Sequence, residues 1–350
     1  MVKNPLQLAL LDVRSEGEFQ QGNFPLSKNV PILDNLQRHQ VGLCYRESGQ
    51  ASAIQLGHHL VDASREGLVR EWKSSLGFSP SALGLVNKRL VYCWRGGLRS
   101  KIACDWMLDA GLEVIRIEGG YKGLRREVLN VFMNYPRFIV LGGLTGSGKT
   151  RMLRLLNNSL NLEDLARHRG SSFGSFYGKS QPSQSSFENS LALQLVGRDR
   201  GNRIAIEDES PRIGKVMMPD SMYTCLANSP FVYLDLDIST RSENIFVEYV
   251  SEPMKNGIHS SALCQLLIES TMRLQKRLGG LLTSEIVRKI SQAFDGEDHE
   301  LHLVWIKKLL VEYYDRRYKW AMEKKNLLPV FFGGWEACLA YLKSLEKQGY

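Results

Sequence analysis

One contiguous run of residues has the composition of a phosphate-binding loop. Residues 143–150 read GLTGSGKT and match the pattern GxxxxGK[ST] in full. They follow an apolar run typical of a strand and precede a helical pattern, which is the context that the motif requires. Glycines let successive backbone N–H groups turn toward phosphate oxygens, and a lysine ammonium neutralises the outer phosphate. The predicted phosphate site comprises Gly143, Gly146, Ser147, Gly148, Lys149 and Thr150.

An acidic strand end adds to this prediction. Residues 203–208 read RIAIED, so that Glu207 and Asp208 end a predicted strand. Carboxylates at such a position hold a metal ion or its water in phosphate-binding folds. The alternative is that these acids cap a helix. We expect no tightly bound cofactor and assign no metal ligands, although Thr150 is placed to ligate Mg²⁺ if a nucleotide is bound.

A second loop has the composition of a nucleophilic anion site. Residues 93–100 read CWRGGLRS, with Cys93 at the end of a predicted strand and Arg99 at the start of a predicted helix. Loop N–H groups, the helix N-terminus and the arginines favour the thiolate, which is the reactive form. The alternative is a small buried thiol. The predicted site comprises Cys93, Arg95, Gly96, Gly97 and Arg99.

Predicted elements place both loops on parallel sheets. Strand patterns at residues 7–13 and 89–93, a helical pattern at 101–111 and a further strand after it form a βαβ order. In the second half, strands are predicted at 203–208 and 231–237, and residues 260–320 are mostly helical. The fold class is therefore α/β. We predict two domains, 1–134 and 135–350, with a boundary near residues 134–136, where Pro136 interrupts a helical pattern.

Composition sets the limits on function. The chain has 350 residues, 43% of them hydrophobic and 23% charged, which is typical of soluble globular proteins and excludes disorder as the main state. An excess of 8 positive charges favours polyanionic partners. Six cysteines without a CxxC pair, no secretory pattern and no long apolar run predict a cytoplasmic protein that does not enter a membrane.

The first half resembles the rhodanese family. Three segments carry the resemblance: the cysteine loop, residues 10–19 and residues 116–126. The resemblance implies a parallel-sheet domain whose cysteine carries sulfur. It also implies that Asp12 and Arg14, in the segment 10–19, belong to the catalytic group. Five residues separate Cys93 from Arg99, whereas single-domain rhodaneses usually have four. The longer loop is similar to that of cysteine phosphatases with the rhodanese fold.

Both halves together resemble the tRNA 2-selenouridine synthase family. Further matching segments are residues 41–61, 162–174, 181–188, 206–214, 275–280 and 313–318. The resemblance implies an N-terminal rhodanese-like domain and a P-loop domain with a helical C-terminal region. It also implies a transferase that replaces sulfur by selenium at C2 of wobble 2-thiouridine in tRNA. Geranyl diphosphate and selenophosphate would be the substrates, S-geranyl-2-thiouridine the intermediate, and a selenophosphate-supplying enzyme a partner.

Candidate contacts to the anticodon stem-loop follow from this resemblance. Residues 304–325 carry seven Lys or Arg against three acids, interleaved with aromatic residues. Cations can pair with phosphates and aromatic rings can stack on unpaired bases, although on a helix many of these rings would face the core. The predicted tRNA-binding residues are Arg169, Lys307, Lys308, Tyr314, Lys324 and Lys325.

Two other functions fit parts of the sequence. The five-residue spacing and the phosphate loop also fit a cysteine-dependent phosphatase or reductase fused to a small-molecule kinase. A regulatory module with a protein-docking rhodanese half is the third reading. Residues 168–189, rich in serine and aromatic residues, are either a flexible linker or a binding loop.

Overall fold

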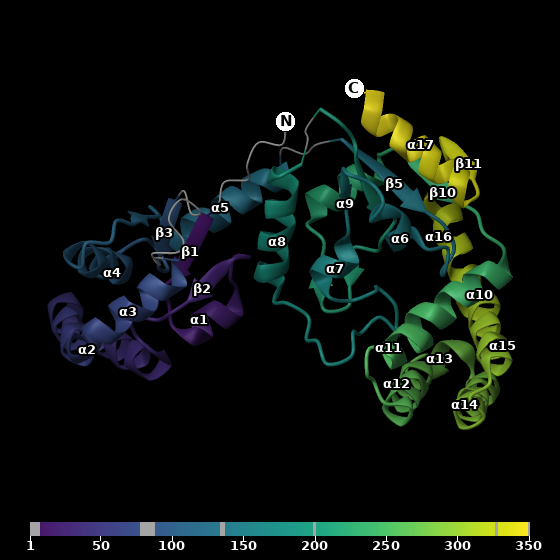
Figure 1. The fold of residues 1–350 in the computed structure, drawn as a ribbon, viewed down its shortest axis with the longest axis horizontal. Coiled ribbons are helices and arrows are strands. Elements are labelled where there is room, and N and C mark those ends of the chain that lie inside the picture. Colours follow the sequence, from purple (N-terminus) through teal and green to yellow (C-terminus); the bar gives the residue numbers. More distant parts are fainter. Residues whose placement is uncertain (1–7, 78–87, 134–136, 199–200, 326–327, 349–350) are drawn as a thin grey trace. The chain divides into compact units, whose positions relative to one another are not determined.

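The structure is a computed structural model that describes residues 8–77, 88–133, 137–198, 201–325 and 328–348 (Figure 1). The chain divides into two compact units, Met1–Val131 with Ser183–Leu193, and Phe132–Pro182 with Gln194–Tyr350. The boundary predicted near residues 134–136 lies outside the described residues. Residues 183–193, which the predicted second domain contains, group with the first unit.

The first unit contains a parallel four-stranded sheet in the order β2-β1-β3-β4. Its strands are β1 (Leu8–Asp12), β2 (Ser27–Asn29), β3 (Lys88–Tyr92) and β4 (Ile115–Arg116). Its helices are α1 (Glu16–Gln21), α2 (Asn35–Val61), η1 (Asp62–Ser64), α3 (Arg65–Ser75), α4 (Leu98–Asp109) and α5 (Gly120–Met133). The predicted βαβ order is therefore confirmed, and the fold of this unit is α/β.

Apolar strand residues form the core of the first unit. Leu11 and Val91 lie on the two central strands and are fully buried. Trp72 of α3 and Met107 of α4 pack against the same cluster, and the Trp72 indole donates to the carbonyl of Val30 at 3.0 Å. This packing fixes the ends of β1 and β3, from which the candidate residues project.

The second unit contains a parallel five-stranded sheet in the order β11-β10-β5-β7-β6. Its strands are β5 (Phe138–Gly142), β6 (Ser159–Leu160), β7 (Ile204–Glu207), β10 (Phe231–Leu234) and β11 (Phe331–Gly333), with a separate antiparallel pair of β8 (Arg212–Ile213) and β9 (Val216–Met217). The strands predicted at 203–208 and 231–237 are confirmed, whereas β6 and β11 are too short to have been recognised in the sequence.

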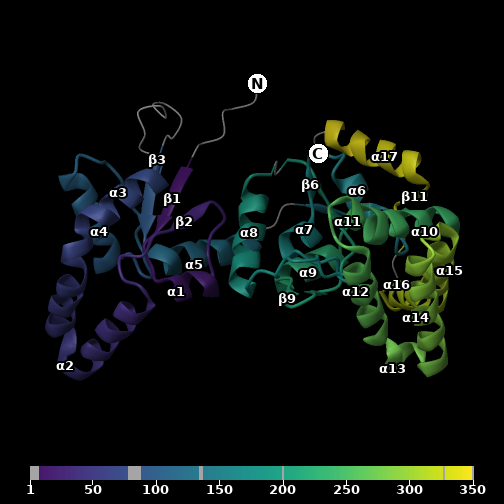
Figure 2. The same ribbon diagram turned by 60° about the horizontal axis from the view of Figure 1, so that its bottom comes forward.

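Helices surround this sheet and extend beyond it (Figures 1 and 2). They are α6 (Lys149–Leu153), α7 (Leu162–Ala166), α9 (Asp220–Ala227), α10 (Ile238–Phe246), the π-helix η3 (Val247–Ser251), α11 (Glu252–Lys255), α12 (Ser260–Met272), α13 (Gln275–Leu278), α14 (Gly280–Asp295), α15 (His299–Leu309), the π-helix η4 (Leu310–Asp315), α16 (Arg316–Lys325) and α17 (Trp335–Gln348). Most of helix α8 (Gln184–Val196) belongs to the first unit. The helical nature predicted for residues 260–320 is confirmed. Helices α12, α14 and α15 pack on one another around Ile286, Ile290 and Trp305.

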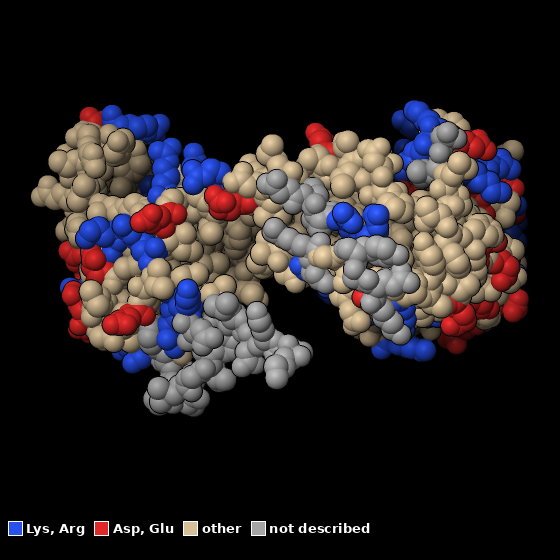
Figure 3. Space-filling model, turned by 90° about the horizontal axis from the view of Figure 1, so that it is seen from above, with Lys and Arg blue, Asp and Glu red and all other residues tan. Residues whose placement is uncertain are grey.

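The surface carries no single dominant basic area on the face drawn in Figure 3. Lys and Arg side chains of the second unit, on the right, form separate groups interspersed with Asp and Glu. The net excess of 8 positive charges is therefore distributed on this face. Among the described residues, no helix is both long enough and apolar enough to cross a membrane.

Candidate functional site

The loop between β5 and α6 folds around its own glycines. Gly143, Gly146 and Gly148 have φ values of +147°, +85° and +81°. A Cβ atom added to Gly146 would lie 2.6 Å from the carbonyl oxygen of Arg241, so this turn requires glycine. The Lys149 ammonium donates to the carbonyl of Gly143 at 2.8 Å. The structure thus brings the predicted phosphate-site residues together in one tight loop.

Side chains of α10 hold this loop from outside. Arg241 donates to the carbonyl of Thr145 at 3.1 Å, and Asn244 donates to the carbonyl of Gly146 at 2.8 Å. Arg241 also forms a two-point ion pair with Asp315, at 2.9 and 2.8 Å. The sequence analysis did not identify these bracing residues, although Asp315 lies in the matching segment 313–318.

Two of the three hydroxyl residues of the loop, Ser147 and Thr150, have different environments. The Ser147 side chain is fully buried, and its Oγ has no hydrogen-bond partner among the described residues. Thr150 Oγ1 donates to Glu163 Oε2 at 3.2 Å. Helix α6, which follows the loop, has only five residues, so its dipole contributes less to anion binding than that of the longer helix expected. Lys149 and the loop amides therefore carry most of the positive potential.

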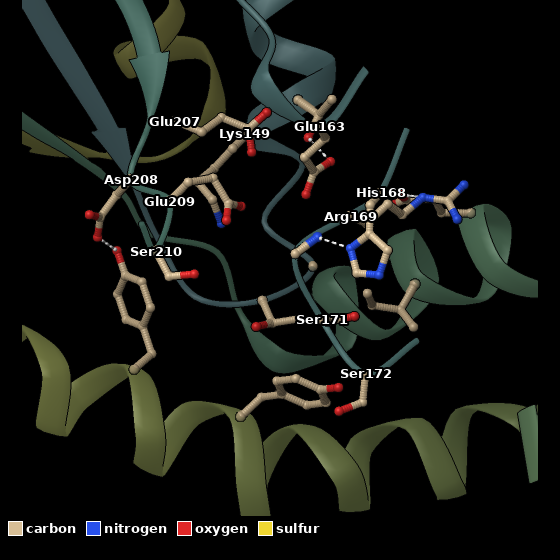
Figure 4. A pocket seen from close by; sticks show the side chains of 18 of the residues that line it. Lys149, Glu163, His168, Arg169, Ser171, Ser172, Glu207, Asp208, Glu209 and Ser210 are labelled. Atoms are coloured by element: carbon tan, nitrogen blue, oxygen red, sulfur yellow. Dashed lines mark hydrogen bonds and ion pairs between the residues drawn. The ribbon is translucent and has the colours of Figure 1, made fainter. Parts of the chain in front are cut away.

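Three carboxylates gather beside Lys149 (Figure 4). One oxygen of each of Glu163, Glu207 and Glu209 lies within 4.8 Å of the others. Burial, and then the charges of neighbouring glutamates, raise the pKa of Glu163 and of Glu207 and raise that of Glu209 to about 7. Oε1 of Glu207 is buried without a hydrogen-bond partner among the described residues. Such a crowded cluster is stabilised by a proton or by a cation.

Asp208 does not belong to this cluster, contrary to the prediction. Its carboxylate accepts from the Tyr318 hydroxyl at 3.3 Å and pairs with the Lys325 ammonium at 2.9 Å, and Figure 4 shows it on the other side of the strand from Glu207. Side chains alternate along an extended chain, so that positions 207 and 209 share one side and position 208 takes the other. Glu209 joins Glu207 in the carboxylate cluster, whereas Asp208 lines the same cavity apart from the cluster.

The cluster has the donor set of a hard divalent cation. Three carboxylates and the hydroxyl of Thr150 supply oxygen atoms only, which are the ligands that Mg²⁺ prefers. The unpartnered oxygen of Glu207 is available to such an ion. We therefore consider that these residues fit Mg²⁺, although the sequence analysis assigned no metal ligands.

The phosphate loop and the carboxylates line one cavity of about 1270 Å³. Residues 168–172, 175 and 176 line the same cavity, which supports the binding-loop interpretation of segment 168–189. Arg169 in this segment pairs with Glu248 at 2.5 Å, and its guanidinium lies 4.5 Å from the ring centre of Phe176. Arg169 is therefore held in place at the cavity wall.

The other predicted tRNA contacts do not form one surface. Tyr314 and Lys325 line the cavity, whereas Lys307, Lys308 and Lys324 are not among its lining residues. Lys308 pairs with Glu285, and Lys325 pairs with Asp208. Two aromatic residues of the same stretch, Trp305 and Tyr313, belong to the helical core. The rings buried there cannot stack on bases, as the alternative to this prediction anticipated.

Cys93 lies at the end of β3, as predicted, but it is covered. Its side chain belongs to the apolar core of the first unit and is 3% exposed. Its Sγ lies 3.2 Å from the hydroxyl of Ser100, a residue that the sequence analysis did not select. Gly96 and Gly120 allow close approach here, because a Cβ on Gly120 would lie 2.3 Å from the carbonyl oxygen of Cys93. Gly97 is exposed and precedes the first residue of α4, Leu98.

The arginines of the cysteine loop differ in their partners. Arg99 forms a two-point ion pair with Glu18, at 2.6 and 3.1 Å, whereas Arg95 is exposed. Burial lowers the pKa of Arg99, but the hydrogen bond and charge of Glu18 overcome this effect and raise it. In this conformation the Arg99 guanidinium, which we expect to face the substrate anion, is paired with Glu18.

Asp12 and Arg14, which are predicted to belong to the catalytic group, are covered by the protein. Both side chains are fully buried and form an ion pair at 2.6 Å. Arg14 also donates to the carbonyl of Gly22 at 2.7 Å, and its guanidinium lies 3.9 Å from the ring centre of Tyr121. Enclosed on all sides by protein, the pair cannot touch a substrate. It holds the end of β1 beside the cysteine loop.

The second unit has the features of a P-loop phosphate-binding domain. Its parallel sheet places a glycine-rich loop with Lys149 after β5 and a carboxylate, Glu207, at the end of the adjacent strand β7. Ligands bind at the carboxyl edge of such sheets. A family model described as tRNA 2-selenouridine synthase AAA domain matches residues 136–348.

Curated relatives match nearly the whole chain. The tRNA 2-selenouridine synthase of Shewanella sediminis (strain HAW-EB3) is 34% identical, over 97% of this chain and 95% of its own length. Those of Shewanella sp. (strain MR-4) and Hydrogenovibrio crunogenus are each 35% identical, over 97% and 96% of this chain and 91% and 95% of their own lengths. This chain belongs to the tRNA 2-selenouridine synthase family.

Proposed function

We propose that this chain is a transferase that replaces sulfur by selenium at C2 of wobble 2-thiouridine in tRNA. Family membership over nearly the full length supports the overall activity. The observation that carries the proposal is the presence, in one chain, of an anion-binding loop with Lys149 and a separate loop with Cys93. In this proposal both loops serve the same base in the anticodon stem-loop, and a second enzyme supplies selenophosphate.

The first stage takes place at the phosphate loop. A geranyl group passes from geranyl diphosphate to the thiocarbonyl sulfur. A carbon–sulfur bond forms, the allylic carbon–oxygen bond breaks, diphosphate leaves and the N3 proton of the base is released to solvent. Lys149 and the loop amides stabilise the charge of the departing diphosphate. An apolar recess next to Thr145, lined by Ile245, Leu267 and Leu309, has a volume of about 30 Å³. A recess of this size takes only a methyl-sized end of the isoprenoid chain, and the remainder of the chain would lie in the larger cavity.

The carboxylates beside the loop complete the diphosphate site. Glu163, Glu207, Glu209 and the hydroxyl of Thr150 fit Mg²⁺ by their chemistry. Bound Mg²⁺ would neutralise the charge that diphosphate gains as it departs. Without a cation the raised pKa values of the three glutamates keep part of the cluster protonated near neutral pH, which limits repulsion of the diphosphate.

The second stage uses the cysteine loop. Alkylation converts the thiocarbonyl sulfur into a better leaving group. The selenium atom of selenophosphate forms a bond to C2, the C2–S bond breaks and geranylthiol is released. Water then cleaves the phosphorus–selenium bond, so that phosphate leaves and selenouridine remains. Cys93, with Arg95 and Arg99, delivers the selenium. Because Glu18 holds Arg99 and Cys93 is covered, delivery requires this ion pair to open.

Two substitutions separate the stages. Lys149→Ala should leave 2-thiouridine in the tRNA, whereas Cys93→Ala should accumulate S-geranyl-2-thiouridine. Nucleoside mass spectrometry of tRNA from cells that express each variant as the sole copy measures both products. Lys255→Ala and Cys44→Ala are matched controls, because Lys255 is exposed outside the cavity and Cys44 is a half-buried thiol on α2.

Two results would count against these assignments. Full geranylation by Lys149→Ala would show that the phosphate loop does not carry the first stage. Conversion of geranylated tRNA to selenouridine by Cys93→Ala would show that Cys93 does not carry the second. Turnover of a phosphoester by a Cys93-dependent reaction, together with Lys149-dependent ATP hydrolysis, would instead favour a phosphatase or reductase joined to a kinase.

A further inference from the structure

Seven arginines line the cavity, and three of them come from the helical C-terminal part of the second unit. Arg273 follows α12, Arg277 lies on α13 and Arg317 lies on α16, and all three contribute to the cavity wall. Arg273 donates to the carbonyl of Ser172 at 3.0 Å. Figure 4 shows Ser172 on the opposite side of the cavity from Lys149. This arginine is therefore attached to the wall that faces the phosphate loop.

Two of these arginines converge on one hydroxyl group. Arg277 Nη1 donates to the Tyr313 hydroxyl at 2.8 Å, and Arg317 Nη1 donates to the same oxygen at 3.0 Å. Tyr313 itself is only 9% exposed and belongs to the helical core. A rigid, neutral acceptor thus holds two positive groups close together, although like charges repel each other. An anion bound between them would offset this repulsion.

The three guanidinium groups have no acidic partner. Among the described residues, no carboxylate lies within the 4.0 Å ion-pair distance of Arg273, Arg277 or Arg317. Of the four other arginines of the cavity wall, Arg154 and Arg169 pair with carboxylates. Arg212 donates to the carbonyl of Gly214, and the Arg151 guanidinium lies 4.5 Å from the ring centre of Trp335. The three residues are exposed, so their charge is available to a ligand at the cavity mouth.

The residues of this wall come from distant parts of the sequence. Arg277 and Arg317 reach the Tyr313 hydroxyl from different helices, and Arg273 is 101 residues from Ser172, which it contacts. The tertiary structure brings these segments to one wall of the cavity.

We propose that Arg277 and Arg317, held by the Tyr313 hydroxyl and joined by Arg273, bind backbone phosphates of the RNA next to the modified nucleotide. That the ligand is RNA rests on the proposed function. Planar guanidinium groups match phosphate oxygens in two-point contacts. The phosphate loop already provides a binding site for a small diphosphate. The exposed arginines lie farther out, where the sugar–phosphate backbone would remain if one nucleotide of the RNA entered the cavity.

The salt dependence of RNA binding tests this site. Each phosphate contact contributes about 0.7–0.9 to the magnitude of the slope of log K against log salt concentration. Relative to about 1 M salt, this contribution makes binding at about 0.15 M salt roughly four- to five-fold tighter for each contact. Arg277→Gln and Arg317→Gln should each produce a loss of this size, and the double variant about a 20-fold loss. Arg277→Lys should keep the slope. The probe is a full-length tRNA transcript with uridine at the wobble position, titrated against the full chain.

Adjacent residues supply matched controls. Lys276 and Arg316 neighbour the two arginines in sequence and are exposed but do not line the cavity. Lys276→Gln and Arg316→Gln should therefore leave the slope and affinity nearly unchanged. Equal effects of the control and site variants would overturn the proposal, and so would an unchanged slope in both site variants. Circular dichroism of each variant verifies folding, and Arg277 provides the test if Arg317→Gln unfolds.

Inorganic pyrophosphate distinguishes RNA from a small ligand. Calorimetry should show unchanged pyrophosphate affinity in Arg277→Gln and Arg317→Gln, and a loss in Lys149→Ala. If the arginine variants lose pyrophosphate and keep their tRNA slope, the arginines serve the small ligand and the RNA proposal is wrong. If Lys149→Ala keeps its pyrophosphate affinity while the arginine variants lose tRNA, the proposed role of the phosphate loop fails and the RNA site stands.

Discussion

The buried ion pair between Arg241 and Asp315 should control the stability of the phosphate loop. Their side chains are only 4% and 13% exposed, and they are joined by two hydrogen bonds, at 2.9 and 2.8 Å. Arg241 also donates to the carbonyl of Thr145 in the loop. Asp315→Asn removes the negative partner and leaves a guanidinium without compensation in a buried position.

The expected cost follows from this burial. Removing one partner of a buried pair costs about 3–5 kcal/mol, and the partial exposure of Asp315 places the value near the lower end, about 3 kcal/mol. Glu312→Gln is the matched control, because it breaks an ion pair with Arg316 whose side chains are 35% and 70% exposed. An exposed pair contributes less than about 1 kcal/mol.

Native-state hydrogen exchange measures this difference in α10. A loss of about 3 kcal/mol accelerates the exchange of amides that open locally by about 100-fold, and peptides covering residues 238–246 should show it in Asp315→Asn but not in Glu312→Gln. Replacing both partners, in Arg241→Met with Asp315→Leu, should recover much of the protection. Equal exchange in Asp315→Asn and Glu312→Gln would refute the reasoning.

Three further predictions concern the two loops and the acidic cluster. Gly146→Ala should abolish pyrophosphate binding measured by calorimetry, because the new Cβ would lie 2.6 Å from a carbonyl of α10. Its cost in stability should exceed the backbone strain of about 1–2 kcal/mol that a positive φ alone imposes. Gly178→Ala, with φ +66° and open space, should cost only that strain and keep binding, so equal losses of binding in the two variants would be inconsistent with this explanation. Burial, then the charge of a neighbouring glutamate, raises the pKa of Glu209 from 4.5 to about 7, so the folded state binds more protons than the unfolded state and thermal stability without Mg²⁺ should fall as the pH rises from 4.5 to 7. Mg²⁺ should reverse this fall and Glu209→Gln should flatten it, whereas a profile that responds to neither would contradict the cation site. Glu18→Gln should release the arginine that Glu18 holds and increase the rate at which iodoacetamide alkylates Cys93, as mass spectrometry would show; an unchanged rate would mean that the ion pair does not control access.

Local chemistry accounts for what could be predicted from the sequence. The phosphate loop is contiguous, and its glycines and Lys149 act within eight residues, so strand, turn and helix patterns were enough to predict its form. Alternation at the end of β7 would also have separated Asp208 from Glu207 and Glu209, because side chains two residues apart share one side of a strand.

Contacts between distant segments required the tertiary structure. The order of parallel strands and the packing of helices decided that Glu163 joins Glu207, that Asp315 braces the loop through Arg241, and that Glu18 holds Arg99. Residue type alone does not predict such pairs, because the chain contains many chemically equivalent acids and bases. Only the fold decides which of them lie next to each other in the same cavity or core. The sequence therefore determined which groups can bind anions, and the fold decided which of them are already occupied by a partner.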